Sequence, residues 1–436
     1  MYWDRSHQDR VLLVHVFTPG SLEDSGDCEE FRQLATDTGA TVVDCWRVPR
    51  ARLDPATCIG SGKVEEIAAA LRMDPVDLVI FDRPLTPIQE RNLERAWSTR
   101  VLDRVGLILD IFARRARTHE GKLQVELAQL DHLRTRLVRG WTHLERQRGG
   151  IGLRGPGETQ LETDRRLIGD RIAALRHRLD RVRSQRATQR RARQRAPVPM
   201  VALVGYTNAG KSSLFNRLTN DRQYAADQLF ATLDPAIRRL VKDRQGEAEV
   251  LVADTVGFLR DLPPGLIAAF RATLEEVNQA QLLLQVIDTA APDRDLQMAA
   301  VDEVLHDIGA DNLPRIRVYN KIDVLGEDPR WRKNEQGQIV DLWISARTGA
   351  GLDHLYQAIE ERLFANRIRI HCALRPNQAA LRAEFFRLGK ILEEHYDEQG
   401  QTHLWVELDR REWGRILQHN DLESCQREDP PSTMPR

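Results

Sequence analysis

The chain has 436 residues, a formal net charge of −1 and 41% hydrophobic residues, a length sufficient for about three domains. The apolar runs are too short to span a bilayer and no signal peptide precedes them, so we expect a cytoplasmic protein with no membrane span. Five cysteines lack Cys-x-x-Cys spacing, which argues against a disulfide framework or a zinc site; they are Cys28, Cys45, Cys58, Cys372 and Cys425.

Residues 1–111 alternate strand and helix signals, which predicts a small parallel α/β domain. The expected strands are Val11–Phe17, Thr41–Val48, Val76–Asp82 and Val101–Leu102, and the expected helices are Glu29–Thr38, Lys63–Leu71 and Pro87–Trp97. The string Gly60-Ser61-Gly62-Lys63 is not a P-loop, because Thr57 stands where a glycine is needed. We interpret it as a glycine-rich turn before a helix; a second nucleotide or anion site there is the alternative.

Residues 112–196 carry an unusual charge. Between Phe112 and Arg195 there are 21 arginines and one lysine against nine acidic residues, a net charge of +13. Apolar residues, Leu133 and Ile172 among them, recur at steps of three and four on both sides of the glycine-rich stretch Gly149–Gly157, which predicts an antiparallel helical hairpin with a loop at its tip. A solvated helix face is the ordinary explanation of such charge, but this excess favours contact with RNA. The arginines expected near the tip are Arg146, Arg148, Arg154, Arg165 and Arg166.

Residues 197–368 contain a complete P-loop between a buried strand and a helix start. It reads Gly205-Tyr206-Thr207-Asn208-Ala209-Gly210-Lys211-Ser212. In such a loop, backbone N–H groups surround phosphates, Lys211 reaches the β- and γ-phosphates, and the Ser212 hydroxyl binds Mg²⁺.

Two further segments belong to the phosphate side. Asp254-Thr255-Val256-Gly257 follows the strand Val250–Ala253, so Asp254 can hold the water shell of Mg²⁺ and the Gly257 N–H can meet the γ-phosphate. Thr232, within Phe230-Ala231-Thr232-Leu233-Asp234, is the expected second hydroxyl ligand of Mg²⁺. The predicted catalytic residues are therefore Lys211, Thr232, Asp254 and Gly257, and the predicted metal ligands are Ser212 and Thr232.

The base side is predicted from two later segments. In Asn320-Lys321-Ile322-Asp323, the Asp323 carboxylate can accept hydrogen bonds from guanine N1–H and the N2 amino group, which adenine lacks. A backbone N–H in Ser345-Ala346-Arg347 can donate to guanine O6. Together these segments predict binding of GTP and GDP and hydrolysis of GTP.

Phe258 follows the glycine of the third segment, where Ras-like enzymes have a glutamine that orients the attacking water. Phenylalanine cannot do this, so we expect slow intrinsic hydrolysis and stimulation by a partner, a switch-loop group or a monovalent cation. Two interpretations of Asn208 stay open. Its amide helps to coordinate K⁺, or asparagine only tolerates the backbone angles of the loop.

Residues 369–418 predict a small α+β appendage, with strands at Ile368–Leu374 and Thr402–Leu408 and helices at Ala379–Leu388 and Glu412–Leu417. The polar, proline-rich segment 419–436 predicts a disordered tail. We expect a monomer.

The chain resembles the HflX family of ribosome-binding GTPases over nearly its whole length. The resemblance depends on the P-loop and on two more specific segments, Gly152-Leu153-Arg154-Gly155-Pro156-Gly157-Glu158-Thr159-Gln160-Leu161-Glu162 and Phe230-Ala231-Thr232-Leu233-Asp234-Pro235. It implies an N-terminal region that binds the large (50S) ribosomal subunit, with the hairpin loop near the peptidyl-transferase region. It also implies Mg²⁺ at Ser212 and Thr232, and a role in ribosome splitting, rescue or assembly.

Two other functions are considered. A tRNA-modifying GTPase would need a catalytic cysteine or a cofactor site outside the GTP-binding segment, and the sequence offers neither. An RNA-remodelling ATPase would need helicase motifs, and none is complete.

Overall fold

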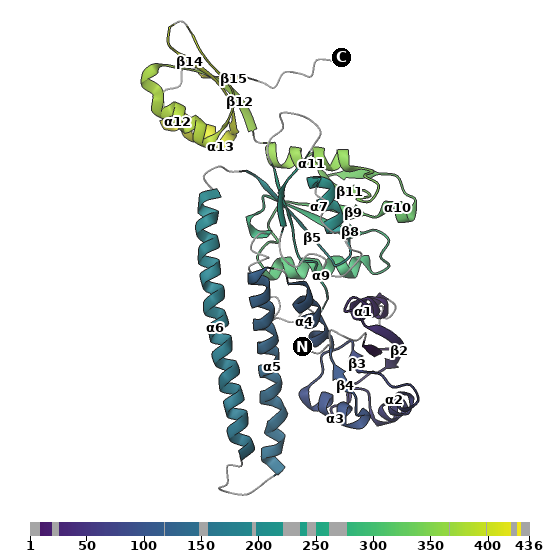
Figure 1. Ribbon diagram of the computed structural model, residues 1–436. Coiled ribbons are helices and arrows are strands. Elements are labelled where there is room, and N and C mark those ends of the chain that lie inside the picture. Colours follow the sequence, from purple (N-terminus) through teal and green to yellow (C-terminus); the bar gives the residue numbers. More distant parts are fainter. Residues whose placement is uncertain are drawn as a thin grey trace.

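The computed structural model describes residues 9–19, 26–116, 118–147, 156–193, 198–220, 236–241, 250–260, 277–365, 367–397, 399–419 and 425–428. These residues form three β-sheets and one long pair of helices (Figure 1). Within these ranges, no helix is both long and apolar enough to cross a membrane.

The first sheet is parallel and small, as the sequence predicts. Its strands are β1 (Arg10–Phe17), β2 (Thr41–Pro49), β3 (Leu78–Phe81) and β4 (Arg100–Leu102), in the order β2-β1-β3-β4. Its helices are α1 (Gly26–Thr36), α2 (Ser61–Met73), α3 (Pro87–Trp97) and α4 (Arg104–Arg115). Strand β1 is apolar on both faces because Val11 and Leu13 pack with α1 and α4, whereas Leu12 and Val14 pack with α2 and α3.

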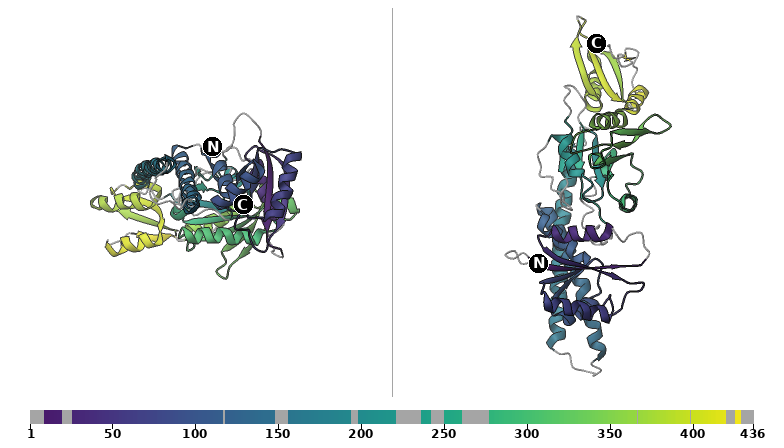
Figure 2. Two further views of the ribbon diagram at one scale, coloured as in Figure 1. Left: turned by 90° about the horizontal axis from the view of Figure 1, so that it is seen from below. Right: turned by 90° about the vertical axis from the view of Figure 1, so that its right-hand side faces the viewer.

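The predicted helical hairpin consists of α5 (His119–Gln147) and α6 (Pro156–Arg193). The two helices lie side by side in all views and extend past the first sheet (Figures 1 and 2). The buried residues that join them are Leu123, Leu175 and Leu179. Leu133, which we expected in the same seam, is 40% exposed. Among the residues of α5 whose side chains the structure describes, the apolar seam lies toward the end that begins at His119.

One arginine fixes the hairpin to the first domain. Arg136 of α5 reaches Glu90 of α3 at 2.6 Å and Asp103, the N-cap of α4, at 2.9 Å. All three side chains are at most 15% exposed. Because a buried charge without a partner is costly, this arrangement holds the two elements in one orientation.

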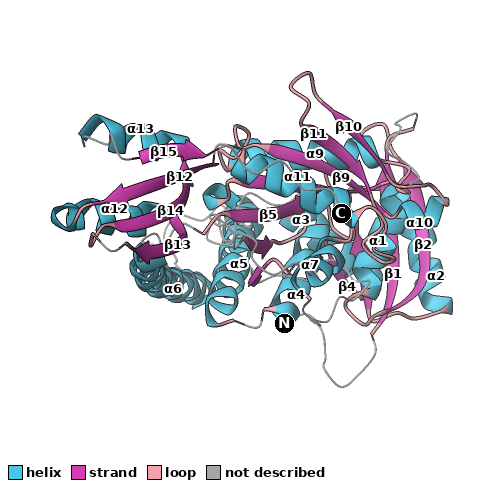
Figure 3. Ribbon diagram, turned by 90° about the horizontal axis from the view of Figure 1, so that it is seen from above, coloured by secondary structure: helices cyan, strands magenta, loops and turns pink. Residues whose placement is uncertain are grey.

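The second sheet has seven strands in the order β10-β11-β9-β8-β5-β7-β6, and only the edge strands β10 and β6 run antiparallel to their neighbours. The strands are β5 (Met200–Gly205), β6 (Ala236–Arg239), β7 (Leu251–Asp254), β8 (Leu282–Asp288), β9 (Arg315–Asn320), β10 (Arg330–Lys333) and β11 (Ile339–Trp343). The helices are α7 (Lys211–Thr219), α9 (Arg294–Asp307), α10 (Ile322–Leu325) and α11 (Leu352–Phe364). Helix α9 packs on one face and α7 and α11 pack on the other (Figure 3). The predicted α/β class is confirmed, and the carboxyl ends of β5, β7, β9 and β11 meet at one edge, where such sheets bind ligands.

The third sheet is antiparallel, in the order β13-β14-β12-β15. Its elements are β12 (Arg367–Leu374), the 3₁₀ turn η1 (Pro376–Gln378), α12 (Ala379–Leu388), β13 (Lys390–Tyr396), β14 (Thr402–Asp409), α13 (Arg410–His419) and β15 (Cys425–Glu428). The prediction of a disordered tail over 419–436 is wrong at β15, because these four residues pair with β12. The rest of that tail beyond His419 lies outside the described residues.

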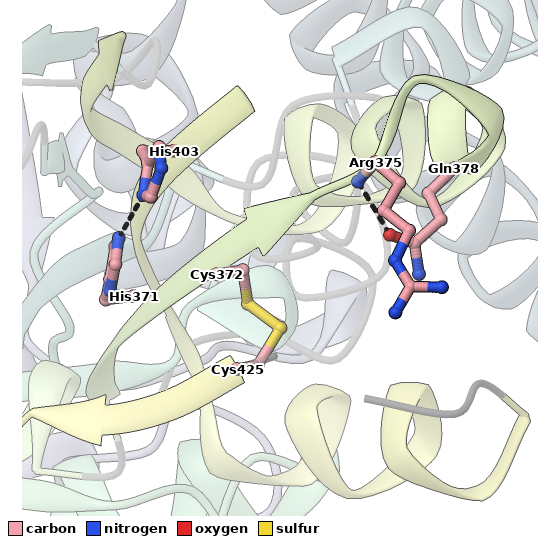
Figure 4. Close-up of a disulfide and its surroundings, with 6 residues drawn as sticks. All are labelled: His371, Cys372, Arg375, Gln378, His403 and Cys425. Carbon is pink, nitrogen blue, oxygen red and sulfur yellow. Dashed lines mark hydrogen bonds between the residues drawn. A yellow bond between two sulfur atoms is a disulfide. The ribbon is translucent and has the colours of Figure 1, made fainter. Parts of the chain in front are cut away.

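The prediction that the cysteines form no disulfide is also wrong. Cys372 and Cys425 are disulfide-bonded, and Figure 4 shows the bond between β12 and β15. The register of these two strands places the two residues directly opposite each other. They are 53 residues apart in the sequence, so their spacing gives no sign of this pairing.

Candidate functional site

The P-loop joins the buried strand β5 to helix α7. Gly205, Asn208 and Gly210 have positive φ angles of 150°, 58° and 92°. A Cβ atom on Gly205 would lie 2.2 Å from the carbonyl oxygen of Val286, and one on Gly210 would lie 2.2 Å from Nδ2 of Asn320. The two glycines are therefore required by close contacts as well as by backbone angles.

Lys211 is buried at the start of α7. Its ammonium donates to the carbonyl oxygens of Gly205, at 3.0 Å, and Tyr206, at 2.6 Å. Burial lowers the pKa of Lys211 to about 8, while the negative charge of Asp254 acts in the opposite direction. The Lys211 ammonium therefore lies within the P-loop, where its positive charge would face bound phosphates, and it is close to the carboxylate of Asp254.

The segment Asp254–Gly257 lies against the P-loop at the end of β7. The hydroxyl of Ser212 donates to Asp254 Oδ2 at 2.9 Å, and the hydroxyl of Thr255 donates to the carbonyl oxygen of Leu203 at 2.6 Å. A Cβ on Gly257 would lie 2.9 Å from Thr207 Cγ2 and 3.0 Å from Lys211 Nζ. Glycine at this position thus allows the two phosphate-side segments to approach each other. Val256 is buried in the core.

Phe258 is buried, with 2% of its surface exposed, and pairs with Tyr206 in a parallel β-bridge. Its N–H donates to the carbonyl oxygen of Gly205 at 3.1 Å, and its carbonyl oxygen accepts from the N–H of Thr207 at 2.8 Å. The hydrophobic residue that replaces the expected glutamine thus forms part of the core and holds the following segment on the P-loop.

Asn320 connects three of the predicted segments. Its side-chain amide donates to the carbonyl oxygen of Ala209 in the P-loop at 2.9 Å, and its Oδ1 accepts from the N–H of Ala346 at 2.9 Å. Both bonds are buried. The P-loop and the base-side segments are therefore held together by one side chain, a role that our sequence argument for Asp323 did not include.

Asp323 and its surroundings make up the base side. The hydroxyl of Ser345 donates to Asp323 Oδ1 at 2.6 Å and accepts from the N–H of Thr348 at 3.1 Å. Lys321 has φ of 68° and pairs with Asp288 at 2.8 Å. The carbonyl oxygen of Arg347 accepts from Arg217 of α7 at 2.8 Å, and Ile322 is buried.

Some predicted residues cannot be placed. Phe230, Ala231, Thr232, Leu233 and Asp234 lie outside the described residues, so one of the two predicted Mg²⁺ ligands has no observed position. The structure brings together the other predicted residues, from Gly205 to Ser212, Asp254 to Gly257, Asn320 to Asp323, and Ser345 to Arg347.

The sequence argument missed the residues that surround Tyr206. The Tyr206 hydroxyl donates to Glu30 of α1 at 2.5 Å and accepts from the N–H of Arg260 at 3.1 Å. Glu30 lies 176 positions from Tyr206 in the chain, and no motif marks it. Only the packing of the first domain against the domain of the seven-stranded sheet brings them together.

The site has the three features that define the class of P-loop GTPases. They are the P-loop, the Asp-x-x-Gly turn at the end of the neighbouring strand, and the Asn-Lys-x-Asp turn beyond β9. Three family models match the chain in agreement with this class: GTP-binding GTPase N-terminal over residues 25–113, GTP-binding GTPase Middle Region over 115–193, and 50S ribosome-binding GTPase over 200–321.

The chain belongs to the HflX family of GTPases. It is 51% identical to the GTPase HflX of Escherichia coli over 409 residues, which is 94% of this chain and 95% of that protein. It is 45% identical to the GTPase HflX of Caldanaerobacter subterraneus over 90% of both chains. Among solved structures, a GTP-binding protein of Sulfolobus solfataricus in complex with GDP aligns with a TM-score of 0.43 and 23% identity, over 81% of this chain and 98% of that chain. As a member of this family, the protein is a GTPase that binds guanine nucleotides.

Proposed function

We propose that this GTPase binds the large ribosomal subunit according to its nucleotide state and acts in ribosome splitting, rescue or assembly. The observation that carries this proposal is the basic helical hairpin, α5 and α6, which is fixed to the first domain through Arg136. The family model that matches residues 200–321 is described as a 50S ribosome-binding GTPase, which supports the same partner.

The exposed arginines of α6 supply the expected RNA contact. Arg165 and Arg166 are exposed, and A-form RNA is recognised mainly through its shape and its phosphates. Other arginines are already engaged across the hairpin, since Arg171 pairs with Glu126 at 2.6 Å and Arg176 with Asp131 at 3.4 Å. We therefore assign the RNA contact to Arg165 and Arg166. The proposal also includes Arg148 and Arg154, which lie outside the described residues, and Arg146, whose side chain is not described.

The phosphate side is proposed to hold Mg²⁺ through Ser212 and Thr232, with Asp254 acting through the water shell. Ser212 Oγ and Asp254 Oδ2 are hard oxygen donors only 2.9 Å apart at one end of the sheet, which suits this ion. When bound, the ion neutralises phosphate charge. Lys211 supplies a second positive charge to the phosphates, and the Gly257 N–H is the proposed donor to the γ-phosphate.

The base side is proposed to read guanine through Asp323, with the Ser345 hydroxyl holding its carboxylate. A backbone N–H of the segment Ser345-Ala346-Arg347 is the proposed donor to guanine O6. The N–H groups of Ser345 and Ala346 already donate to the carbonyl oxygen of Ala350 and to Asn320 Oδ1. Asn320 has its side-chain bonds within the protein, so we assign it the role of joining the base side to the P-loop rather than that of contacting the base.

Slow intrinsic hydrolysis with stimulation by the ribosomal partner is part of the proposal, because buried Phe258 cannot orient water. The φ of 58° at Asn208 supports the interpretation that this residue serves the backbone of the loop, and K⁺ coordination by its amide is an additional proposal.

The domain boundaries that we propose are 1–111, 112–196, 197–368 and 369–418. Helix α4 crosses the first boundary, since it runs from Arg104 to Arg115. We further propose that the protein is a cytoplasmic monomer.

Co-sedimentation with separated ribosomal subunits tests the proposed function. The protein should pellet with large subunits in the presence of a non-hydrolysable GTP analogue and much less in the presence of GDP. Small subunits serve as the control. Equal recovery with GDP and with the analogue, or recovery with small subunits only, would contradict the proposal.

A further inference from the structure

Two cysteines of the first domain lie with their sulfur atoms in direct contact. Cys28 is in the first turn of α1 and Cys45 is on β2, and their Sγ atoms are 3.2 Å apart. Both are free thiols. Because a disulfide bond is about 2.05 Å long, the sulfurs would have to approach each other by about 1.1 Å to form one. Small rotations about the two Cα–Cβ bonds close such a gap.

The packing of α1 on the first sheet holds this pair together. Phe31 and Leu34 of α1 are fully buried in the core cluster against which Cys45 packs. Strand β2 is at the edge of its sheet, and Figure 1 shows α1 beside it. The two sulfurs are therefore positioned by the core of the domain. A reaction between them is intramolecular and is favoured by this fixed proximity.

The two thiols have different roles in this contact. Burial and the hydrogen bond with Cys28 raise the pKa of Cys45 to about 12, although the positive charge of Arg32 acts in the opposite direction. Cys45 therefore keeps its proton near neutral pH, and its S–H donates to Cys28 Sγ. Because the thiolate is the form that attacks an oxidant, Cys28 is the candidate for the first reaction. Cys28 is only partly buried, so a small oxidant can reach it.

The third free cysteine provides an internal reference. Cys58 is 1% exposed and packs in the core on the other face of the first sheet, with Ile59 and Ile67. Burial raises the pKa of its thiol to about 11. Cys58 is thus a thiol of the same domain that is closed to solvent and lies apart from Cys28 and Cys45.

We propose that Cys28 and Cys45 are an oxidation site, which a hydroperoxide converts to a disulfide that fixes the start of α1 to β2. With hydrogen peroxide, the Cys28 thiolate attacks one oxygen. The S–O bond forms, the O–O bond breaks, and the departing hydroxide takes up a proton to become water. Cys45 Sγ then attacks Cys28 Sγ, and the S–S bond forms as the S–O bond breaks. The hydroxyl group leaves with the proton of Cys45 as a second water.

The new bond would change the local opening of α1. Cys28 and Cys45 are 17 positions apart, and in the reduced protein only packing keeps the first turn of α1 on the sheet. A covalent bond at this point suppresses every opening that separates the two elements. This inference goes beyond the proposed function and does not depend on it, since it requires neither GTP nor a ribosome.

Peptide mass spectrometry of the full-length protein is the test. The protein is treated with hydrogen peroxide at neutral pH, the peroxide is removed with catalase, and the denatured chain is alkylated without reductant. We expect a peptide pair linked through Cys28 and Cys45. Alkylation of these two cysteines should fall at least tenfold, while that of Cys58 should change by less than twofold. Dithiothreitol after the peroxide should restore the alkylation of both.

Two variants separate the steps. In Cys45→Ser, Cys28 has no thiol to react with, so dimedone should label it as the sulfenic acid. In Cys28→Ser, Cys45 should stay a free thiol without dimedone label. Cys58→Ala is the control and should form the Cys28–Cys45 bond as the parent does. Thermal unfolding of each variant shows whether the fold is retained.

Hydrogen exchange measures the effect of the bond on the helix. After oxidation, the amides of α1 should exchange at least fivefold more slowly, and those of α2 should be unchanged. Two results would overturn the oxidation site, namely alkylation of Cys28 and Cys45 to the same extent as Cys58 after peroxide, or dimedone on Cys45 in place of Cys28. Equal exchange of α1 in the reduced and oxidised proteins would overturn the restraint on α1.

Discussion

The hydroxyl of Ser345 donates to the carboxylate of Asp323, with 2.6 Å between Oγ and Oδ1. The two residues come from different segments, beyond β9 and beyond β11, which are neighbouring strands. The proposed guanine-reading carboxylate is therefore held in place by the segment that would contact guanine O6.

The first prediction concerns Asp323→Asn. The amide places a donor where guanine offers donors, so GTP affinity should fall by about a hundredfold or more, and xanthosine nucleotides should bind better than GTP. Titration with labelled GDP and XDP measures both affinities. Asp328→Asn, at an exposed acid on the adjoining turn, is the control and should keep GTP affinity. Unchanged GTP binding in Asp323→Asn would show that Asp323 does not recognise guanine.

The second prediction concerns pH. Burial lowers the pKa of Lys211 from 10.5 to about 8, so the free protein loses this proton above that pH. Nucleotide phosphates favour the ammonium form, so binding between about pH 8 and 10.5 takes up a proton, and affinity falls by up to about tenfold per unit of rising pH. Calorimetry with GDP at pH 9, in buffers of different ionisation enthalpy, measures the uptake, and the same titration at pH 7 is the control. Equal heats in all buffers at pH 9 would contradict the prediction.

The sequence predicted the P-loop, its neighbouring strands and the base-side segments because their chemistry depends on residues that are close in the chain. Gly205, Lys211 and Asp323 are in this group. Contacts between distant segments could not be predicted this way. Nothing local marks Glu30 as a partner of Tyr206, Asn320 as a link between Ala209 and Ala346, or Cys425 as a strand residue facing Cys372.

The strands of the last domain illustrate a second limit. Strand β14 alternates buried and half-buried residues, and its pattern is clear in the sequence. Strand β13 has no fully buried residue and includes charged residues such as Lys390 and Glu393. Its residues show no alternation of buried and exposed positions, so the strand is defined only by its pairing with β14.

The third prediction concerns hydrolysis. Turnover should be slow for the protein alone in Na⁺ and faster with large subunits, because Phe258 cannot orient water. If Asn208 binds K⁺, turnover should also rise in K⁺, and Asn208→Gly should lose this rise while keeping the positive φ that Asn208 adopts. Fast turnover alone in Na⁺ would refute the first part. Equal rates in K⁺ and Na⁺ would leave Asn208 only its backbone role.

The fourth prediction concerns the disulfide between Cys372 and Cys425. When the unfolded protein is alkylated without reductant, only Cys28, Cys45 and Cys58 should react, because these are the free thiols. Cys425→Ser should lower the free energy of unfolding of the last domain by about 4 kcal/mol in the chain-entropy model. Mass spectrometry of the alkylated peptides is the measurement. Alkylation of all five cysteines before reduction would show that the bond does not form.

The last prediction concerns the hairpin. Replacing Arg146, Arg148, Arg154, Arg165 and Arg166 by Ala should weaken binding to large subunits. It should also flatten the dependence of log K on log salt by about 0.7–0.9 for each phosphate contact that is lost. GTP affinity should not change, because the nucleotide site lies in a different domain.

The matched control for this variant removes arginines that already have acidic partners. Arg171→Ala/Arg176→Ala takes two positive charges from the same helix, but these side chains pair with Glu126 and Asp131 across the hairpin. Exposed ion pairs of this kind contribute little to stability, so the hairpin should persist and the salt dependence should change much less. If the variant with all five arginines replaced binds subunits as well as the parent at every salt concentration, the basic hairpin is only a solvated surface. The ribosome contact would then have to lie on the first or the last sheet.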